Sequence, residues 1–468
     1  MIKISALVVF FLMLLSGLSW ADPGAVVPAG ADSLQNHWGQ KIVRADSTTA
    51  HFEDQSRPTW EKIALVPYYI IGIPFRIVDV AGRETVKTLD RWGIFDLPPA
   101  EHAGLPLPYG VYLLPEGGIS GLEGISYGLN IRKPDFLGED NRAFLTISSS
   151  TKHADKLAGG FYFQMNPTWG LQLGAGTADL PLTRYYGLGY GSSAGDRSFY
   201  NRISRWVGAE LDRDLGLSTS LEMRSYYSQV EARESRYEVD EGLSDIHAGN
   251  LPYGFPGESN GWSFKLGLVR DATVENGRPQ GRGFQKASIS WFQGTDDPDL
   301  SFIQYAFDLQ HFFPLWFTGR TLGLRAFGVR LHNNGTSEIP LTRMVTMYHP
   351  NSLRGFSDLR FYGLGNVGLS AEYRWPLWVA KGRKGLGMDA YIFTDMGQVF
   401  DRSSEIAINH LSQTAGFGVR FIGSEGQFLG RFELGFSNEE TVVTLTFSQT
   451  FQHHGKGLLH GKDPSRRP

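Results

Sequence analysis

The sequence predicts an all-β fold: a closed antiparallel transmembrane β-barrel of about sixteen strands, preceded by a short amphipathic helix. Three observations lead to this prediction. From about residue 121 onward, apolar and polar residues alternate with a period of two between turn-rich breaks. Aromatic residues make up 13% of the 468 residues, and 57 residues are glycine. After residue 21, no apolar run reaches the roughly 20 residues of a membrane helix, because Pro67 and Pro74 interrupt the longest one, residues 63–75.

The first 21 residues have the features of a secretory signal peptide. Lys3 supplies the positive charge, and an apolar run over residues 4–20 follows it. Ser19 and Ala21 are small residues at the positions that a signal peptidase requires, so we expect cleavage before Asp22. The chain contains no cysteine, which excludes a lipid-modified cysteine, a disulfide framework and a thiolate metal site.

Residues 22–118 are expected to form a periplasmic segment that is polar and irregular at its start. Residues 75–92 within it are amphipathic at helical spacing, with Phe75, Val78 and Val86 on one side and Arg83 and Lys87 on the other. This helix would either lie in the membrane interface or plug the barrel mouth, or else belong to a small periplasmic cap. The sequence alone does not decide between these alternatives.

The barrel itself is expected over residues 119–451, with surface-exposed loops at residues 179–200 and 228–261. Residues 303–310 show the alternation clearly, because Tyr305 and Phe307 share one face while Gln304 and Asp308 share the other. Polar faces rich in Gly, Arg, Glu and Asp suit a wet lumen, and aromatic-rich faces suit lipid. Because backbone groups in lipid must all be paired, such strands have to close into a ring. A secreted soluble β-protein is the competing interpretation.

The end of the barrel sequence carries a terminal-strand signal. Phe447 continues the apolar face of the last strand, and Phe451 ends that strand. The charged, glycine-containing tail of residues 452–468 is expected to be disordered.

Composition and motifs argue against other functions. The net charge of −4 is small for this length, which argues against nucleic acid as a partner. Residues 191–195, with the sequence GSSAG, match the serine-hydrolase elbow, but they lack the apolar strand before and the helix after that this motif needs. His453 and His454 lie in the tail and are better explained as a solvated pair than as a metal site. We therefore expect no catalytic residues, no metal and no cofactor.

One tetrapeptide stands out: Leu353-Arg354-Gly355-Phe356, near the end of a long polar stretch. The strands that follow carry Glu372 and Asp395, and their alternation places both acids on the polar, lumen-facing side. A loop arginine opposite two inward carboxylates would hold its loop inside the pore, because a guanidinium fork makes strong and geometrically selective bonds to carboxylates.

These residues resemble the Omp85 superfamily, the bacterial surface-antigen and outer-membrane assembly barrels. The resemblance covers roughly residues 348–451. Its motifs include the tetrapeptide, Glu372 with Pro376-Leu377, Phe393-Thr394-Asp395-Met396-Gly397, Gly416-Phe417-Gly418-Val419-Arg420 and terminal Phe451. The resemblance implies sixteen strands, a sixth extracellular loop over residues 332–365 that folds into the lumen, and a loop lock formed by the tetrapeptide with Glu372, Asp395, Gly397, Gly416, Gly418 and Arg420.

The resemblance also implies a location in the outer membrane and a role in its biogenesis, by protein insertion or translocation or by lipid transfer. The expected partners are the lipid bilayer and outer-membrane protein or lipid substrates, and self-association into a homo-oligomer stays open. Family members usually carry periplasmic POTRA modules, and residues 22–121 show no convincing β-α-α-β-β order. This departure puts translocation in doubt, so a passive channel or surface antigen remains the alternative.

Overall fold

The computed structural model describes residues 34–35, 41–42, 105–120, 123–237, 241–272, 283–315, 319–347, 352–379, 387–422 and 428–446. The chain divides into two compact units, residues 1–51 and 52–468. The first unit contains the paired strands β1 (Leu34–Gln35) and β2 (Lys41–Ile42). The expected signal peptide, the helix at 75–92, the tail, Phe447 and Phe451 lie outside the described residues. Within the described ranges, no helix is long and apolar enough to cross a membrane.

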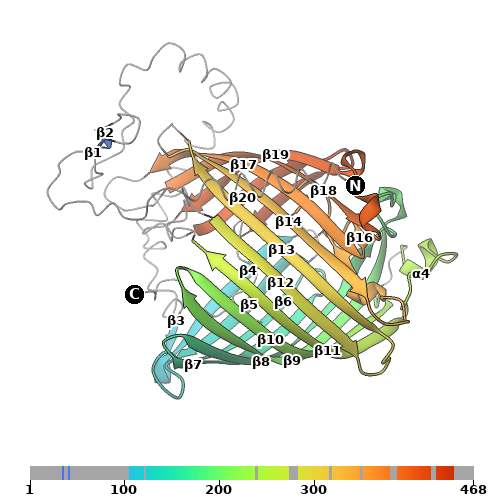
Figure 1. The fold of residues 1–468 in the computed structure, drawn as a ribbon, viewed down its shortest axis with the longest axis horizontal. Coiled ribbons are helices and arrows are strands. Elements are labelled where there is room, and N and C mark those ends of the chain that lie inside the picture. Colours follow the sequence, from blue (N-terminus) through green and yellow to red (C-terminus); the bar gives the residue numbers. More distant parts are fainter. Residues whose placement is uncertain are drawn as a thin grey trace, which may run out of the picture. The chain divides into compact units, whose positions relative to one another are not determined.

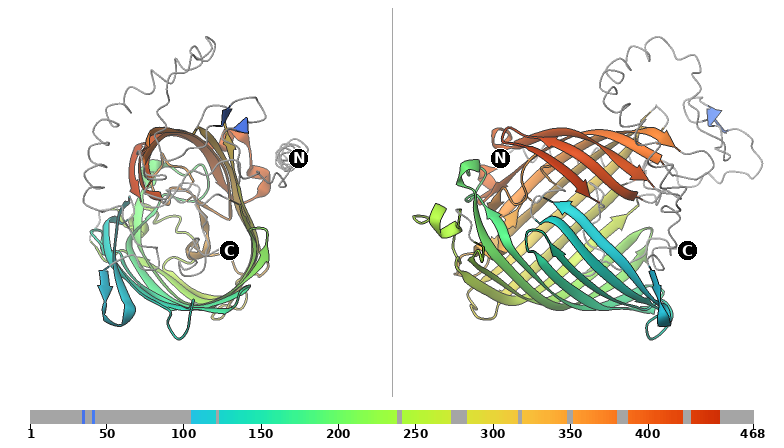
Figure 2. Two further views of the ribbon diagram at one scale, coloured as in Figure 1. Left: turned by 90° about the vertical axis from the view of Figure 1, so that its left-hand side faces the viewer. Right: turned by 180° about the vertical axis from the view of Figure 1, so that it is seen from behind.

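The second unit is a closed antiparallel barrel (Figures 1 and 2). Its wall strands are β4 (Val111–Ser120), β5 (Gly124–Pro134), β6 (Arg142–Ser150), β7 (Asp155–Asn166), β8 (Trp169–Tyr185), β9 (Ser198–Gly216), β10 (Thr219–Glu234), β11 (Gly257–Asp271), β12 (Gly283–Gly294), β13 (Ser301–Pro314), β14 (Thr321–Asn333), β17 (Gly365–Val379), β18 (Gly387–Phe400), β19 (Ser412–Ile422), β20 (Phe428–Phe436) and β21 (Thr441–Thr446). With short β3 (Leu105–Leu107), which pairs with β4, the described ring has seventeen strands, close to the number of about sixteen expected from the sequence.

Helical turns occur only as short pieces among the described residues. They are η1 (Pro108–Gly110), η2 (Ala194–Asp196), α4 (Leu243–Ile246), η3 (Leu341–Arg343), η4 (Ser403–Glu405) and η5 (Ile408–His410). A further small hairpin, β15 (Val345–Thr346) with β16 (Tyr362–Gly363), lies in the segment between β14 and β17.

The period-two alternation sorts side chains between the outside and the lumen, which confirms the barrel prediction. On β13, Tyr305 and Phe307 lie on the outer face and are 48% and 43% exposed. Gln310 on the same strand is 2% exposed and lies on the inner face. Backbone ladders join each strand to its neighbours around the ring, so the peptide groups of the wall are paired with each other as a lipid environment requires.

The barrel begins earlier than the sequence indicated. Its first wall strand starts at Val111, not at the boundary of 119. Pro115 and the glycine pair Gly117-Gly118 hide the alternation there, because neither residue type is typical of strands. The ladder nevertheless continues through Pro115, which lies in register with Leu129 of β5.

Strands β8 to β11 run well into the segments that were expected to be loops. The connections that remain are residues 186–197 and 235–256, so the expected loops at 179–200 and 228–261 are shorter than predicted. Where a strand rises beyond the lipid, neither of its faces needs to be apolar, so the sequence signal fades while the backbone ladder persists.

The ring closes at the junction between β21 and β4, which we call the seam. Among the described residues, these strands share one register position, Leu445 with Ile119. The neighbouring ladder between β20 and β21 has six register positions, from Arg431 with Thr446 to Phe436 with Thr441.

Candidate functional site

The conspicuous arginine lies in the segment between β14 and β17, of which the structure describes residues 334–347 and 352–364. We call this segment the lumen loop, because its side chains bond to the inward faces of the wall strands. Arg343 lies at one of its anchoring points and donates to the hydroxyl groups of Ser228 on β10 and Ser259 on β11. Burial lowers the pKa of Arg343 to about 10, which still leaves it charged at neutral pH. This anchoring point is on a different part of the ring from the one at Arg354.

Arg354 is 1% exposed and bonds to two adjacent wall strands. Its Nε and Nη2 donate to the two carboxylate oxygens of Asp395 on β18, each at 2.8 Å. Its Nη1 donates to Oε2 of Glu372 on β17 at 2.7 Å. The backbone N–H of Arg354 also donates to Asp395, at 3.2 Å. The bidentate bond to Asp395 sets the orientation of the guanidinium plane.

The surroundings of the guanidinium include a third acid and an aromatic ring. Glu433 on β20 lies 3.8 Å from Nη1 of Arg354 and accepts a hydrogen bond from the Tyr391 hydroxyl at 2.8 Å. The guanidinium carbon lies 3.5 Å from the centre of the Phe393 ring, a cation–π geometry. Glu372 is shared with Arg374, whose Nε lies 2.6 Å from Oε1. Buried charges of both signs thus meet in one hydrogen-bonded network, as burial of charge requires.

Glycines allow the lumen loop to approach the wall closely. A Cβ at Gly355 would lie 2.6 Å from the backbone carbon of Phe436, and a Cβ at Gly435 would collide with the backbone carbonyl of Arg354. The loop and β20 therefore touch backbone to backbone, which only glycine permits. On β19, a Cβ at Gly416 would clash with the ring of Phe393, and one at Gly418 would lie 2.5 Å from the ring of Tyr391.

The apolar residues of the tetrapeptide are buried inside the ring. Leu353 and Phe356 pack in a cluster with Phe327, Met347, Phe361 and Val399. The rings of Phe356 and Phe361 meet edge to face with their centres 5.2 Å apart. A Cβ at Gly397 would collide with the methyl group of Met347, so this glycine makes room for the same cluster.

Arg420 is also buried and lies on the inner face of β19, in register with Asp389 of β18. The structure thus brings Arg354, Glu372 and Asp395 into direct contact, and Arg420 interacts electrostatically with Glu372 and Arg374 of the same network. Sequence reasoning missed Glu433, Tyr391 and Phe393 as members of the site. The signal for Glu433 was available, because it alternates with Phe432 and Leu434 and so belongs to the polar face.

The elbow-like segment is a loop feature. Ser193 accepts a hydrogen bond from the N–H of Gly195 at 3.1 Å and caps the single turn η2. The strand after this turn, β9, begins at Ser198, so the helix that a hydrolase elbow needs is replaced by a strand.

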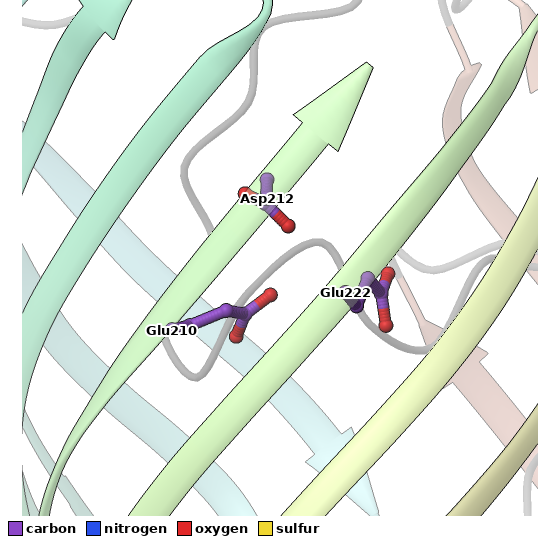
Figure 3. Close-up of side chains that lie close together, drawn as sticks. All are labelled: Glu210, Asp212 and Glu222. Atoms are coloured by element: carbon purple, nitrogen blue, oxygen red, sulfur yellow. The ribbon is translucent and has the colours of Figure 1, made fainter. Parts of the chain in front are cut away.

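Three acids lie together on the inner wall, away from the lumen loop. Glu210 and Asp212 of β9 and Glu222 of β10 can bring one oxygen each within 4.8 Å of one another (Figure 3). Basic residues already partner this cluster, since Nε of Arg224 lies 2.9 Å from Glu210 and Nζ of Lys286 lies 2.8 Å from Glu222. Neutralised carboxylates have little attraction left for a cation, so we do not assign a metal here.

The Omp85 superfamily domain matches residues 112–453 of the chain. The chain belongs to the Omp85 superfamily. As a member of this superfamily it is an outer-membrane barrel, and the superfamily is one of non-enzymatic proteins.

One solved structure agrees with this assignment at the level of the fold, and two others are more distantly similar. BamA from Haemophilus ducreyi lacking POTRA domains 1–3 matches with a TM-score of 0.52 and 14% identity, over 72% of this chain and 68% of that one. CdiB from Acinetobacter baumannii matches with a TM-score of 0.45 and 13% identity, over 72% of this chain and 58% of that one. CdiB from Escherichia coli has a TM-score of 0.46 and 14% identity, over 74% of this chain and 61% of that one. No curated protein sequence matches the chain.

Proposed function

We propose that this Omp85 barrel acts in outer-membrane biogenesis, by inserting or translocating protein or by moving lipid, and that the lumen loop pinned by Arg354 is its gate. The proposed partners are the bilayer itself and outer-membrane protein or lipid substrates. The observation that carries the proposal is the buried network that ties Arg354 of the lumen loop to Asp395 and Glu372 on the wall. The part of the wall that would open is the seam, where the first and last long strands of the wall meet.

The Arg354 network supports a gate and weakens the passive-channel alternative. Arg354 and Asp395 are each 1% exposed and Glu372 is fully buried, so protein shields this part of the inner wall from bulk water. A passive pore would gain nothing from a buried ion pair in its path. A gate must hold its loop firmly in one position and also allow the loop a second, released position. Charge-assisted bonds between a loop and a rigid wall meet both needs, because they are strong while formed and can be broken as a unit.

The proposal is tested by the outer-membrane composition of a strain that lacks the gene. We expect altered amounts of outer-membrane protein or lipid, restored by the wild-type chain but not by the Arg354→Ala variant at equal abundance. An unaltered membrane would remove the biogenesis role and favour the passive barrel. Conductance in planar bilayers separates the two further, since a passive channel would conduct steadily with or without the Arg354 contact.

A further inference from the structure

Arg360 is a second buried arginine of the lumen loop, six residues after the first. It is 1% exposed, and all three of its guanidinium nitrogens bond to protein groups. Nε and Nη2 donate to the two carboxylate oxygens of Glu439, at 2.7 and 2.9 Å. Nη1 donates to the hydroxyl of Ser192 at 2.8 Å, and Nη2 also donates to its backbone carbonyl at 2.6 Å. The guanidinium carbon lies 4.8 Å from the ring centre of Tyr186.

The partners of Arg360 come from two distant parts of the chain. Glu439 lies in the turn between β20 and β21, the hairpin that contributes one side of the seam. Ser192 lies in the connection 186–197, within the GSSAG segment that resembled a hydrolase elbow. This connection is also bound to the lumen loop by its backbone, since the N–H of Gly189 donates to the carbonyl of Tyr362 at 2.8 Å.

Two further contacts join the lumen loop to the same hairpin. The N–H of Ser357 donates to the carboxylate of Glu440, the neighbour of Glu439. Gly355 and Gly435 allow the loop and β20 to touch backbone to backbone. The loop is therefore fixed along the end of the last hairpin, from β20 to the turn that precedes β21.

We propose that Arg360 is a positioning residue that couples the lumen loop to the seam by clamping the β20–β21 turn. While the Arg360–Glu439 pair is intact, the last hairpin is held by the loop, and β21 stays against β4. When the pair breaks, the hairpin loses this restraint, and the seam opens more often. Ser192 completes the clamp by fixing the other edge of the guanidinium, so the arginine cannot swing away with the turn. This inference rests on the proposed function in one respect: it takes the seam between β21 and β4 as the part of the wall that opens.

Hydrogen exchange of the β21 amides measures this coupling, because the exchange rate follows the population of the opened state. With the full-length protein in lipid nanodiscs, Arg360→Gln and Glu439→Gln should each raise exchange across residues 441–446 by roughly 5- to 150-fold, the usual range for coupled sites. The double variant should raise β21 exchange no further than either single variant does, because both substitutions remove the same contact. Glu439 is only part-buried, so its variant tests the inference even if Arg360→Gln fails to fold.

Two controls make the result specific. Arg343→Gln removes a half-buried arginine of the lumen loop that bonds to β10 and β11 instead, so exchange in β21 should not change. In the cysteine-free chain, a disulfide between Ile119→Cys and Leu445→Cys, the register pair of the seam, should abolish the increase caused by Arg360→Gln. The inference fails if exchange does not rise, if the rise survives the disulfide, or if Arg343→Gln produces it equally. Increased exchange with a normal outer membrane in the deletion strain would keep the coupling and remove only the biogenesis role.

Discussion

Replacing Arg354 with alanine should release the lumen loop while leaving the barrel intact. In the variant, Glu372 keeps its bond from Arg374 at 2.6 Å. Asp395 loses both 2.8 Å bonds from the guanidinium and, among the described side chains, is left with the Thr414 hydroxyl at 3.3 Å. Removing one partner of a buried ion pair costs about 3–5 kcal/mol. The wall ladders do not involve this side chain, so the cost falls on the inward position of the loop.

A penalty of that size shifts the balance between the docked and the released loop by roughly 10²- to 10³-fold. Single-channel recordings in planar bilayers should therefore show larger or noisier conductance, and the folded barrel should still resist heat during electrophoresis. Arg354→Lys is the graded comparison, because it keeps the charge but not the bidentate fork, and we expect an intermediate effect. Channels of the alanine variant that cannot be distinguished from the wild type would refute the pinned-loop reasoning.

Further predictions concern the backbone contact at Gly435, the Tyr391–Glu433 hydrogen bond, the acid cluster of β9 and β10, and the signal-peptide cleavage site. Gly435→Val should reproduce the conductance of the Arg354 variant, because its side chain would collide with the backbone carbonyl of Arg354. Tyr391→Phe removes the 2.8 Å bond to Glu433 and should lower stability by about 1 kcal/mol, measured as an earlier loss of heat-resistant mobility. Millimolar Ca²⁺ should leave the unfolding temperature unchanged, since basic side chains already neutralise the acids of β9 and β10. Mass spectrometry of the exported protein should find Asp22 as the first residue.

The sequence predicts the barrel and the central ion pairs because both are encoded locally. A period of two assigns each strand residue to the lumen or the lipid, so the sequence alone places Glu372 and Asp395 inside the barrel. The resemblance of the tetrapeptide then supplies the loop. The first strand was less visible, since Pro115 interrupts the pattern although the ladder passes through it.

Contacts between distant segments could not be predicted in the same way. Arg360 and Ser192 are 168 residues apart, and neither alternation nor a motif connects them. The sequence also does not predict the backbone contact that Gly355 and Gly435 permit, because that contact depends on how close two backbones come in space. Such features depend on the angle at which a loop descends into a ring, which nothing in the local sequence encodes.

The unequal length of the strands gives the barrel an oblique rim. Asp155, the first residue of β7, lies in register with Asp179, so residues 180–185 of β8 rise above their neighbour. At the usual rise and tilt this is roughly 15 Å of additional wall. On a cell surface, the side built by β8 to β11 would stand well above the lipid, while the side near the seam would lie close to the membrane plane. Antibodies and other large particles would meet the high side first, and the seam would be screened from them by the height of the opposite wall.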